Sequence, residues 1–409
     1  MTFKPKFWIQ ISLINLLIIS ILGLIMRYKI GFDFPYLDQK NILHAHSHFA
    51  FSGWIAHSIY VLMLQFIANK QANFKFKTYK IPLLINLFCA YGMLISFFFT
   101  GYSSLSILLS SITIFNNAFF TYFLFRDFKL MQKSEASIPW FKAGLCFNLL
   151  SSLGTFYLAY TMSTRHFNQD LYLASVYFYL HFQYNGFFIF SCMGFALHTL
   201  KLFIPSFQNQ KIIFILFFSA CIPAYFLSTL WTKLPLWLYI LTVLAAITQV
   251  LAWYLLVKQI HKAHKNGNQL SKFSKFMLLF VAIAFTIKLM LQLGSTIPEI
   301  SKLAFGFRPV VIAYLHLVLL AIISVFLLSQ FYILQLISPN KHNKTALMVI
   351  LFGIFMNEVV LGLQGVASFS NLPILYINQV LLIIGLVIFI GLISLNFYQT
   401  KYPAINTNN

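Results

Sequence analysis

Long, nearly uncharged apolar segments recur along the whole chain, and this repetition limits its fold more than any other feature. A helix needs about 20 mostly apolar residues to cross a bilayer. Twelve segments of this kind run over approximately 7–27, 43–67, 80–100, 104–126, 142–162, 172–199, 211–230, 235–257, 273–294, 309–336, 346–366 and 373–397. They are too long and continuous for barrel strands, in which polar and apolar residues alternate. The sequence therefore predicts an all-α integral membrane protein with about twelve transmembrane helices.

These helices are expected to form a single domain over residues 1–402, followed by a short polar tail at 403–409. Of the 409 residues, 60% are hydrophobic and only 9% are charged, whereas soluble domains carry about 25% charged residues. The four cysteines all lie inside apolar segments without a C-x-x-C spacing, which is typical of buried small side chains. Membrane lipid is thus the first partner that the composition predicts.

The basic residues indicate which way the chain crosses the membrane. The termini and the even-numbered loops hold 20 of the 28 Lys and Arg residues, the odd-numbered loops hold seven, and Lys288 lies inside a segment. Cytoplasmic loops are enriched in Lys and Arg, so both termini are expected in the cytoplasm, as in a multi-pass protein of a bacterial-type inner membrane. Because the net charge of +21 is spread over alternate loops, it does not predict nucleic-acid binding.

Three histidines lie at one expected depth in three separate segments. His48, His181 and His316 occur in the second, sixth and tenth segments, each of which begins on the outer face in this topology. At a rise of 1.5 Å per residue they lie roughly 8–15 Å below the outer boundary. A histidine inside a membrane is costly without a partner and therefore indicates a functional site. Three at one depth predict a layer that holds a metal or a haem.

The second segment begins with the sequence HAHSH, which contains His44, His46 and His48. His44 and His48 are four residues apart and share a helix face, whereas His46 points elsewhere. Such a pair could bind zinc. Alternatively, His44 and His46 are solvated residues at the membrane interface.

Around these histidines the chain resembles the heme-copper oxidase superfamily, the large catalytic subunits of cytochrome c oxidases, quinol oxidases and nitric oxide reductases. The stretches that carry the resemblance are AHSHFAFSGW in the second segment and VVIAYLHLVLL in the tenth. The resemblance implies twelve helices, cytoplasmic termini and a low-spin haem between helices two and ten. It assigns the two axial ligands to His48 and His316, with His46 as the nearest alternative to His48. The 48 Phe and 21 Tyr residues could line an apolar slot for the porphyrin.

The resemblance also implies a second site, but its ligands are incomplete. In YLHFQYNGFF, His181 matches the first ligand of the non-haem metal, and Asn185 stands where relatives carry an acidic or tyrosine side chain. Tyr314 replaces the histidine that holds the high-spin haem, so it is either a haem ligand or a packing residue. The seventh segment lacks the family's histidine pair. The sequence therefore does not predict a second haem or a copper ion.

Two charged residues lie well inside predicted spans, and a third lies at the outer boundary. Lys288 and Glu358 are the two inside; they serve either a proton route or a structural charge pair, or Lys288 extends toward the interface. Arg308 lies directly before the tenth segment, about two helical turns before His316. It either pairs with haem propionates or anchors the helix at the interface.

Together these features predict a membrane electron-transfer protein with a bis-histidine b-type haem. A quinol or a cytochrome would donate electrons, and partner subunits are expected from the resemblance. If it is an enzyme, it is a respiratory oxidoreductase of the terminal oxidase or nitric oxide reductase type. The alternative is a non-redox transporter, or a sensor of haem or nitric oxide without turnover. A transporter would show repeats in matching halves of the chain, and the sequence shows no such pairing.

Overall fold

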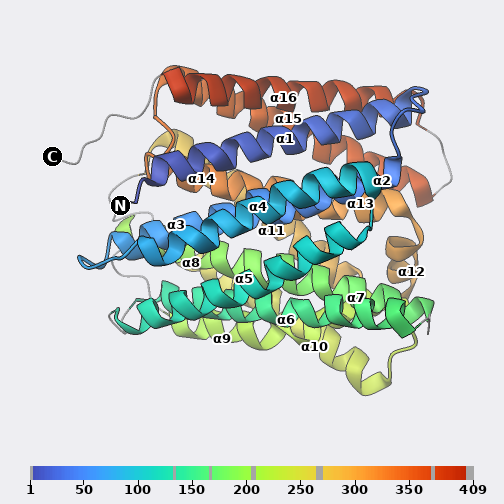
Figure 1. Cartoon of the computed structure of the whole chain (residues 1–409). Helices are drawn as coiled ribbons and strands as arrows, with labels where there is room; N and C mark the ends of the chain where they lie inside the picture. The colour runs from blue at the N-terminus through green and yellow to red at the C-terminus, as the bar shows by residue number, and fades with distance from the viewer. Residues whose placement is uncertain are drawn as a thin grey trace. The chain divides into compact units, whose positions relative to one another are not determined.

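The chain folds almost entirely into helices, as the computed structural model in Figure 1 shows. The structure describes residues 3–131, 135–164, 168–203, 209–263, 270–369 and 374–401, and none of these residues lies in a strand. The expected all-α class is therefore confirmed. The polar tail expected at 403–409 lies outside the described residues.

Within those ranges, nine helical segments are long and apolar enough to cross a membrane. They are Pro5–Gly31, Gln39–Ala68, Lys77–Thr100, Ser104–Lys129, Leu236–His261, Lys272–Gly294, Arg308–Ile333, Lys341–Phe369 and Ile377–Lys401. Two shorter helices, α9 (Gln210–Cys221) and η3 (Pro223–Thr229), are bent by 42° and would form a tenth span if counted as one. The chain is thus a multi-pass membrane protein.

The fifth and sixth predicted segments are helical but are not among these nine. They correspond to α6 (Ser137–Thr164) and to the run of α7 (Gln169–His181), η2 (Phe182–Phe188) and α8 (Ile189–Phe203). Both carry polar side chains that bond each other, since Gln183 Nε2 donates to Asn148 Oδ1 and to Ser151 Oγ, both at 2.8 Å. The number of twelve spans stays a prediction.

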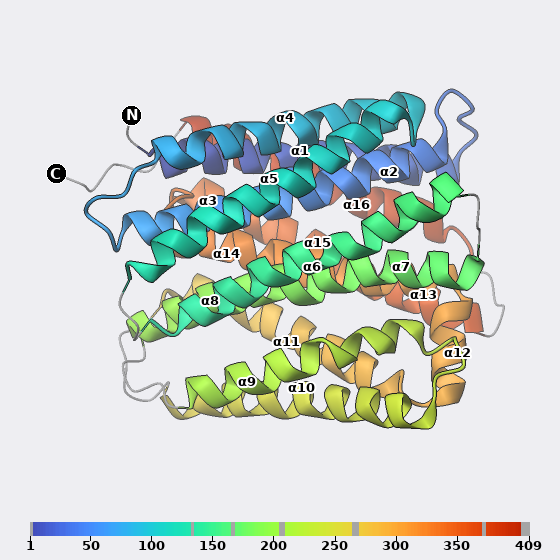
Figure 2. The ribbon, with the colours of Figure 1, turned by 60° about the horizontal axis from the view of Figure 1, so that its bottom comes forward.

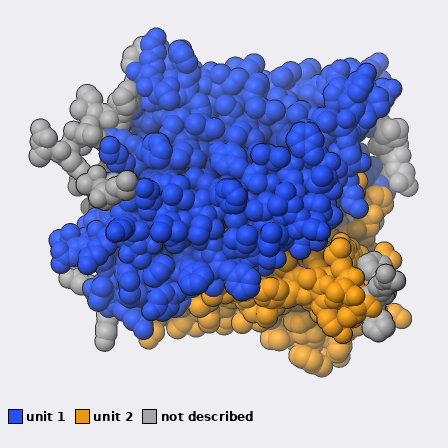
Figure 3. All heavy atoms as spheres, in the orientation of Figure 1, with its two compact units in different colours: residues 1–131, 327–409 blue, residues 132–326 orange. Residues whose placement is uncertain are grey.

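The helices cluster into two compact units, shown in blue and orange in Figure 3. Unit 1 comprises Met1–Met131 and Leu327–Asn409, and unit 2 comprises Gln132–Phe326. The division falls inside α14 (Val325–Ile333). The single domain expected over residues 1–402 stays a prediction, and each unit is described by itself below.

In unit 1 the two ends of the chain pair with each other. Helix α16 (Ile377–Lys401) packs against both α1 (Pro5–Gly31) and α15 (Lys341–Phe369), and the red and blue helices run side by side in Figure 1. Asn396 fastens this pair, because its Nδ2 donates to Leu13 O at 3.2 Å and its Oδ1 accepts from Gln10 Nε2 at 3.0 Å. Side-chain amides commonly join helices in this way inside a membrane.

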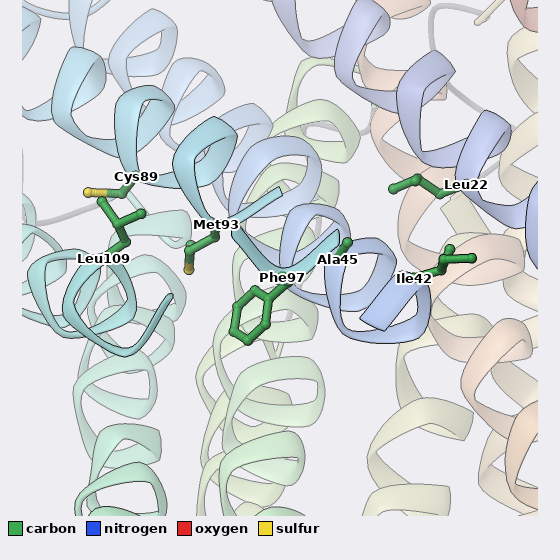
Figure 4. Packing of buried hydrophobic residues seen from close by; sticks show 7 residues of the cluster. All are labelled: Leu22, Ile42, Ala45, Cys89, Met93, Phe97 and Leu109. Atoms are coloured by element: carbon green, nitrogen blue, oxygen red, sulfur yellow. The ribbon is translucent and has the colours of Figure 1, made fainter. Parts of the chain in front are cut away.

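The second predicted segment is the most enclosed of the nine spans. Of its apolar window, 89% is buried, against 28% for Ser104–Lys129. It consists of α2 (Gln39–Phe49), η1 (Ala50–Ala56) and α3 (His57–Ala68). Figure 4 shows the apolar cluster that packs around its N-terminal part, with residues from α1, α2, α4 (Lys77–Thr100) and α5 (Ser104–Lys129). The cluster consists of Leu22, Ile42, Ala45, Cys89, Met93, Phe97 and Leu109.

In unit 2, α6 packs against α7, η2 and α8, whereas α10 (Leu236–Ala263) packs against α9, η3 and α11 (Lys272–Gly294). Figure 2 shows α9 beside α10 and α7 and α8 beside α6. The short helix α12 (Pro298–Gly306) precedes α13 (Arg308–His316) and was not predicted. Its first residue is Pro298, which suits the first turn of a helix because that position needs no N–H donor.

Large apolar side chains cover much of the surface in both units. Phe88 and Phe99 in unit 1 are 70% and 72% exposed, and Leu236 and Trp237 in unit 2 are 72% and 67% exposed. Soluble monomers rarely expose contiguous apolar surface on this scale. The exterior therefore agrees with contact to lipid acyl chains.

Candidate functional site

Three helices contain a π-helical stretch, and each stretch follows one of the predicted histidines. Stretch η1 begins two residues after His48, whereas η2 and η4 (Leu317–Ser324) begin directly after His181 and His316. No other π-helix occurs in the part of the chain that the structure describes. π-Helical turns are rare and are frequent at functional sites. The local backbone thus marks the same three positions as the sequence analysis.

This arrangement also recurs at nearly constant spacing, because the three histidines are 133 and 135 residues apart. In each case a short α-helix ends at or next to the histidine, a π-helix follows, and a second α-helix completes the run. This repetition of the local structure was not expected from the sequence. The signal was present in the spacing of the histidines, but a π-helix leaves no simple pattern in hydropathy.

In unit 1, His44 and His48 face the end of α4, as their spacing predicts. The His48 ring stacks on Phe97 with centroids 4.2 Å apart, and its Nε2 lies 3.3 Å from the Tyr102 hydroxyl. The His44 ring meets the Tyr102 ring edge-on at 4.7 Å. His46 points to the opposite side, where its Nδ1 lies 3.2 Å from Ile19 O of α1. The two faces of HAHSH therefore have different neighbours.

These contacts give no support to a zinc site at the histidine pair. Structural zinc is almost always held by four ligands. Among the residues that the structure describes, no group of three or more His, Cys, Asp or Glu side chains is placed to hold a metal ion. The rings of His44 and His48 both meet the Tyr102 ring edge-on, at 4.7 and 6.1 Å between centroids.

In unit 2, the hydrogen bond of His316 fixes the roles of its two ring nitrogens. Its Nδ1 lies 2.9 Å from Ile312 O in the preceding turn of α13. A carbonyl oxygen only accepts, so Nδ1 carries the proton and Nε2 carries the lone pair. Histidines that bind metals commonly donate their other N–H in this way. His46 has the same arrangement toward Ile19 O.

Two other residues of α13, Arg308 and Tyr314, lie in different surroundings. Tyr314 is partly buried, and its ring meets that of Tyr184 on η2 with centroids 6.4 Å apart. Arg308 is the first residue of the helix and is exposed. Tyr314 thus faces η2 within unit 2, and the haem roles of both residues stay predictions.

His181 is completely buried, and both of its ring nitrogens have partners. Its Nε2 donates to Cys221 O at 2.9 Å, and its Nδ1 accepts from Asn185 Nδ2 at 3.2 Å. Cys221 is the last residue of α9, just before the chain bends at Pro223. Carbonyls at a helix end need an outside donor, so His181 caps α9. Metal binding by His181 stays a prediction, and it would require these bonds to be exchanged.

Lys288 lies in the same polar region of unit 2. Its side chain is only 2% exposed, and its Nζ is 5.4 Å from the centre of the Phe285 ring. It lines a small cavity together with Asn185, Cys221 and Gln249. Neither the proximity of Lys288 to the partners of His181 nor the position of Gln249 could be predicted from the sequence, because these residues lie on separate helices.

Glu358, the other charged residue inside a predicted span, belongs to α15 in unit 1. It is partly buried, and its Oε1 accepts from Asn357 Nδ2 at 3.1 Å. The predicted proton route and the predicted charge pair with Lys288 both stay predictions.

A scan against protein-family models finds no match for this chain, and no curated protein matches it either. The residues themselves therefore carry the functional argument.

Proposed function

We propose that the protein is a haem-binding electron-transfer protein of the membrane that resembles the catalytic subunit of heme-copper oxidases. His48 and His316 are the proposed axial ligands of a low-spin b-type haem. The observation that carries the proposal is that each of these histidines directly precedes a π-helix, by two residues for His48 and by one for His316. The two residues belong to different compact units, so the support comes from the local surroundings of each.

The donor chemistry of both histidines fits a haem iron. The bond from His316 Nδ1 to Ile312 O leaves the lone pair on Nε2, which is the nitrogen that an iron needs. The His48 ring is held against Phe97, so its orientation is restrained by packing. A haem held by two histidines supplies a one-electron carrier. The protein's own part is to fix the rings and to exclude water from them.

His46 is the alternative ligand on the second helix. It shares with His316 a bond from Nδ1 to a backbone carbonyl, whereas Nε2 of His48 faces a hydroxyl that a haem iron would displace. Variants of His46 and His48 decide between the two.

The proposal includes one haem and no copper. In the described part of the chain, α9 and η3 carry no histidine, and the ring nitrogens of His181 are both engaged. Arg308 is proposed to pair with the haem propionates. A quinol or a cytochrome would serve as the electron donor, with partner subunits, in an inner membrane with both termini in the cytoplasm.

The test is an absorption spectrum of the full chain purified from membranes in detergent. We expect the sharp reduced bands of a six-coordinate haem. His48→Ala and His316→Ala should each abolish these bands, whereas His46→Ala should retain them. His261→Ala, at an exposed position of α10, is the matched control and should keep the full haem content.

Two results would contradict the proposed ligands or the haem itself. Loss of the bands in His46→Ala alone would move the ligand from His48 to His46. A colourless purified protein, also after reconstitution with haem, would refute the proposal and favour a transporter.

A further inference from the structure

A small polar cavity lies in unit 2 beside His181, between η2, α9, α10 and α11. Its polar lining consists of Asn185, Cys221, Gln249 and Lys288, and the rest of its wall is apolar. Asn185, Gln249 and Lys288 are only 5%, 5% and 2% exposed. The three polar side chains thus line one cavity and are almost entirely covered by the protein.

Two side-chain oxygens at this cavity accept no hydrogen bond from the described residues. No donor from the described residues reaches Asn185 Oδ1 or Gln249 Oε1, although both atoms are buried. The Asn185 amide is already oriented, because its Nδ2 donates to His181 Nδ1. Buried polar groups without a partner cost free energy comparable with a lost hydrogen bond, so these two oxygens indicate a missing donor.

The size and the charges of the cavity restrict what can supply that donor. Its volume is about 10 Å³ for a sphere the size of a water molecule, which is roughly the room that one water needs. Two carbonyl oxygens disfavour an anion, and the nearby Lys288 disfavours a metal cation. A neutral molecule with two donor hydrogens and one acceptor matches the two oxygens and the lysine N–H group.

We propose that Asn185, Gln249 and Lys288 form a binding site for one water molecule. The water donates to Asn185 Oδ1 and Gln249 Oε1 and accepts from Lys288 Nζ. Through Asn185 it joins Lys288 to His181 and to the Cys221 carbonyl in one hydrogen-bonded chain. This site does not depend on the proposed haem, and it explains how the membrane-embedded Lys288 is accommodated.

The first test is a cryo-EM map of the full chain in lipid nanodiscs, at a resolution that shows ordered water. We expect one density peak within hydrogen-bonding distance of all three side-chain atoms. The peak should be lost in Gln249→Leu. Direct contact between Lys288 Nζ and either oxygen, or a cavity without density, would overturn the proposal.

The second test is a double-mutant cycle in thermal unfolding with Gln249→Leu and Lys288→Met. A shared water couples the two sites, so the shifts in Tm should deviate from additivity by about 2–4 °C. The control pairs Lys288→Met with Gln259→Leu, because Gln259 of α10 also has an unpartnered buried Oε1 but does not line the cavity; these shifts should be additive. Additive shifts in the Gln249 cycle would contradict the proposal.

Discussion

The histidines of this protein differ in what Nδ1 of the ring contacts. In His46 and in His316, Nδ1 donates to a backbone carbonyl. His181 uses both nitrogens within the protein. The sequence predicted that His44 and His48 share a face, because helix geometry alone decides that. It could not predict that His181 caps α9, since that bond joins residues 40 positions apart.

The capping role of His181 leads to a stability prediction. Replacing His181 by Leu leaves the Cys221 carbonyl and the Asn185 amide without their partners in a buried region. We expect a loss of about 1–3 kcal/mol for each group, measured by thermal unfolding in detergent. His261→Leu, at an exposed position, should change the stability by less than about 0.5 kcal/mol. A His181→Leu variant as stable as His261→Leu would contradict the capping role.

At the scale of elements, hydropathy located every long helix but not the irregular features inside them. Each predicted segment overlaps a helix of the structure. The three π-helices, the bend at Pro223 and the short helix α12 were not predicted. Hydropathy reports the length and apolar content of a segment. The hydrogen-bond register inside a helix depends instead on the neighbours that pack against it, and those neighbours are not known from one segment.

The turn between α4 and α5 places Tyr102 beside His48, and Gly101 makes this turn. Gly101 has φ of +61°, and a Cβ there would lie 2.5 Å from Asn41 Oδ1 in α2. Gly101→Ala should therefore reduce the stability by about 1–3 kcal/mol and weaken the contacts that hold His48. Gly294→Ala is the control, because a Cβ there meets no atom within 4 Å. Equal unfolding temperatures of the two variants would show that the turn is not strained by a side chain.

At the scale of the whole molecule, the composition predicts a multi-pass membrane protein. The long apolar helices and the exposed apolar side chains of the structure agree with this prediction. The assignment of helices to units 1 and 2 could not be predicted from the sequence, because the units are defined by packing between residues that are far apart in the chain. The pairing of α1 with α16 is an example, since Gln10 and Asn396 are 386 positions apart. The direction of insertion rests on the distribution of Lys and Arg alone.

That direction is tested by labelling single cysteines in intact cells. In a variant with Cys89, Cys146, Cys192 and Cys221 replaced by Ala, a cysteine is introduced by Lys75→Cys or by Lys233→Cys. Both positions are exposed and lie between helices. If the termini are cytoplasmic, a membrane-impermeant maleimide should label Lys233→Cys in intact cells, whereas Lys75→Cys should react only after permeabilisation. The reverse pattern would place the termini outside.

The π-helices have a geometric consequence for how these spans tolerate change. Each residue of an α-helix advances the side-chain direction by about 100°, and a π-helix holds more residues per turn. The residues before it are therefore out of phase with those after it. Deleting one residue from such a stretch would restore a regular α-helix but swing His48, His181 or His316 to another side of its span. The π-helix thus sets the angle between the two parts of the span, so that the residues before it face a direction that the residues after it do not determine.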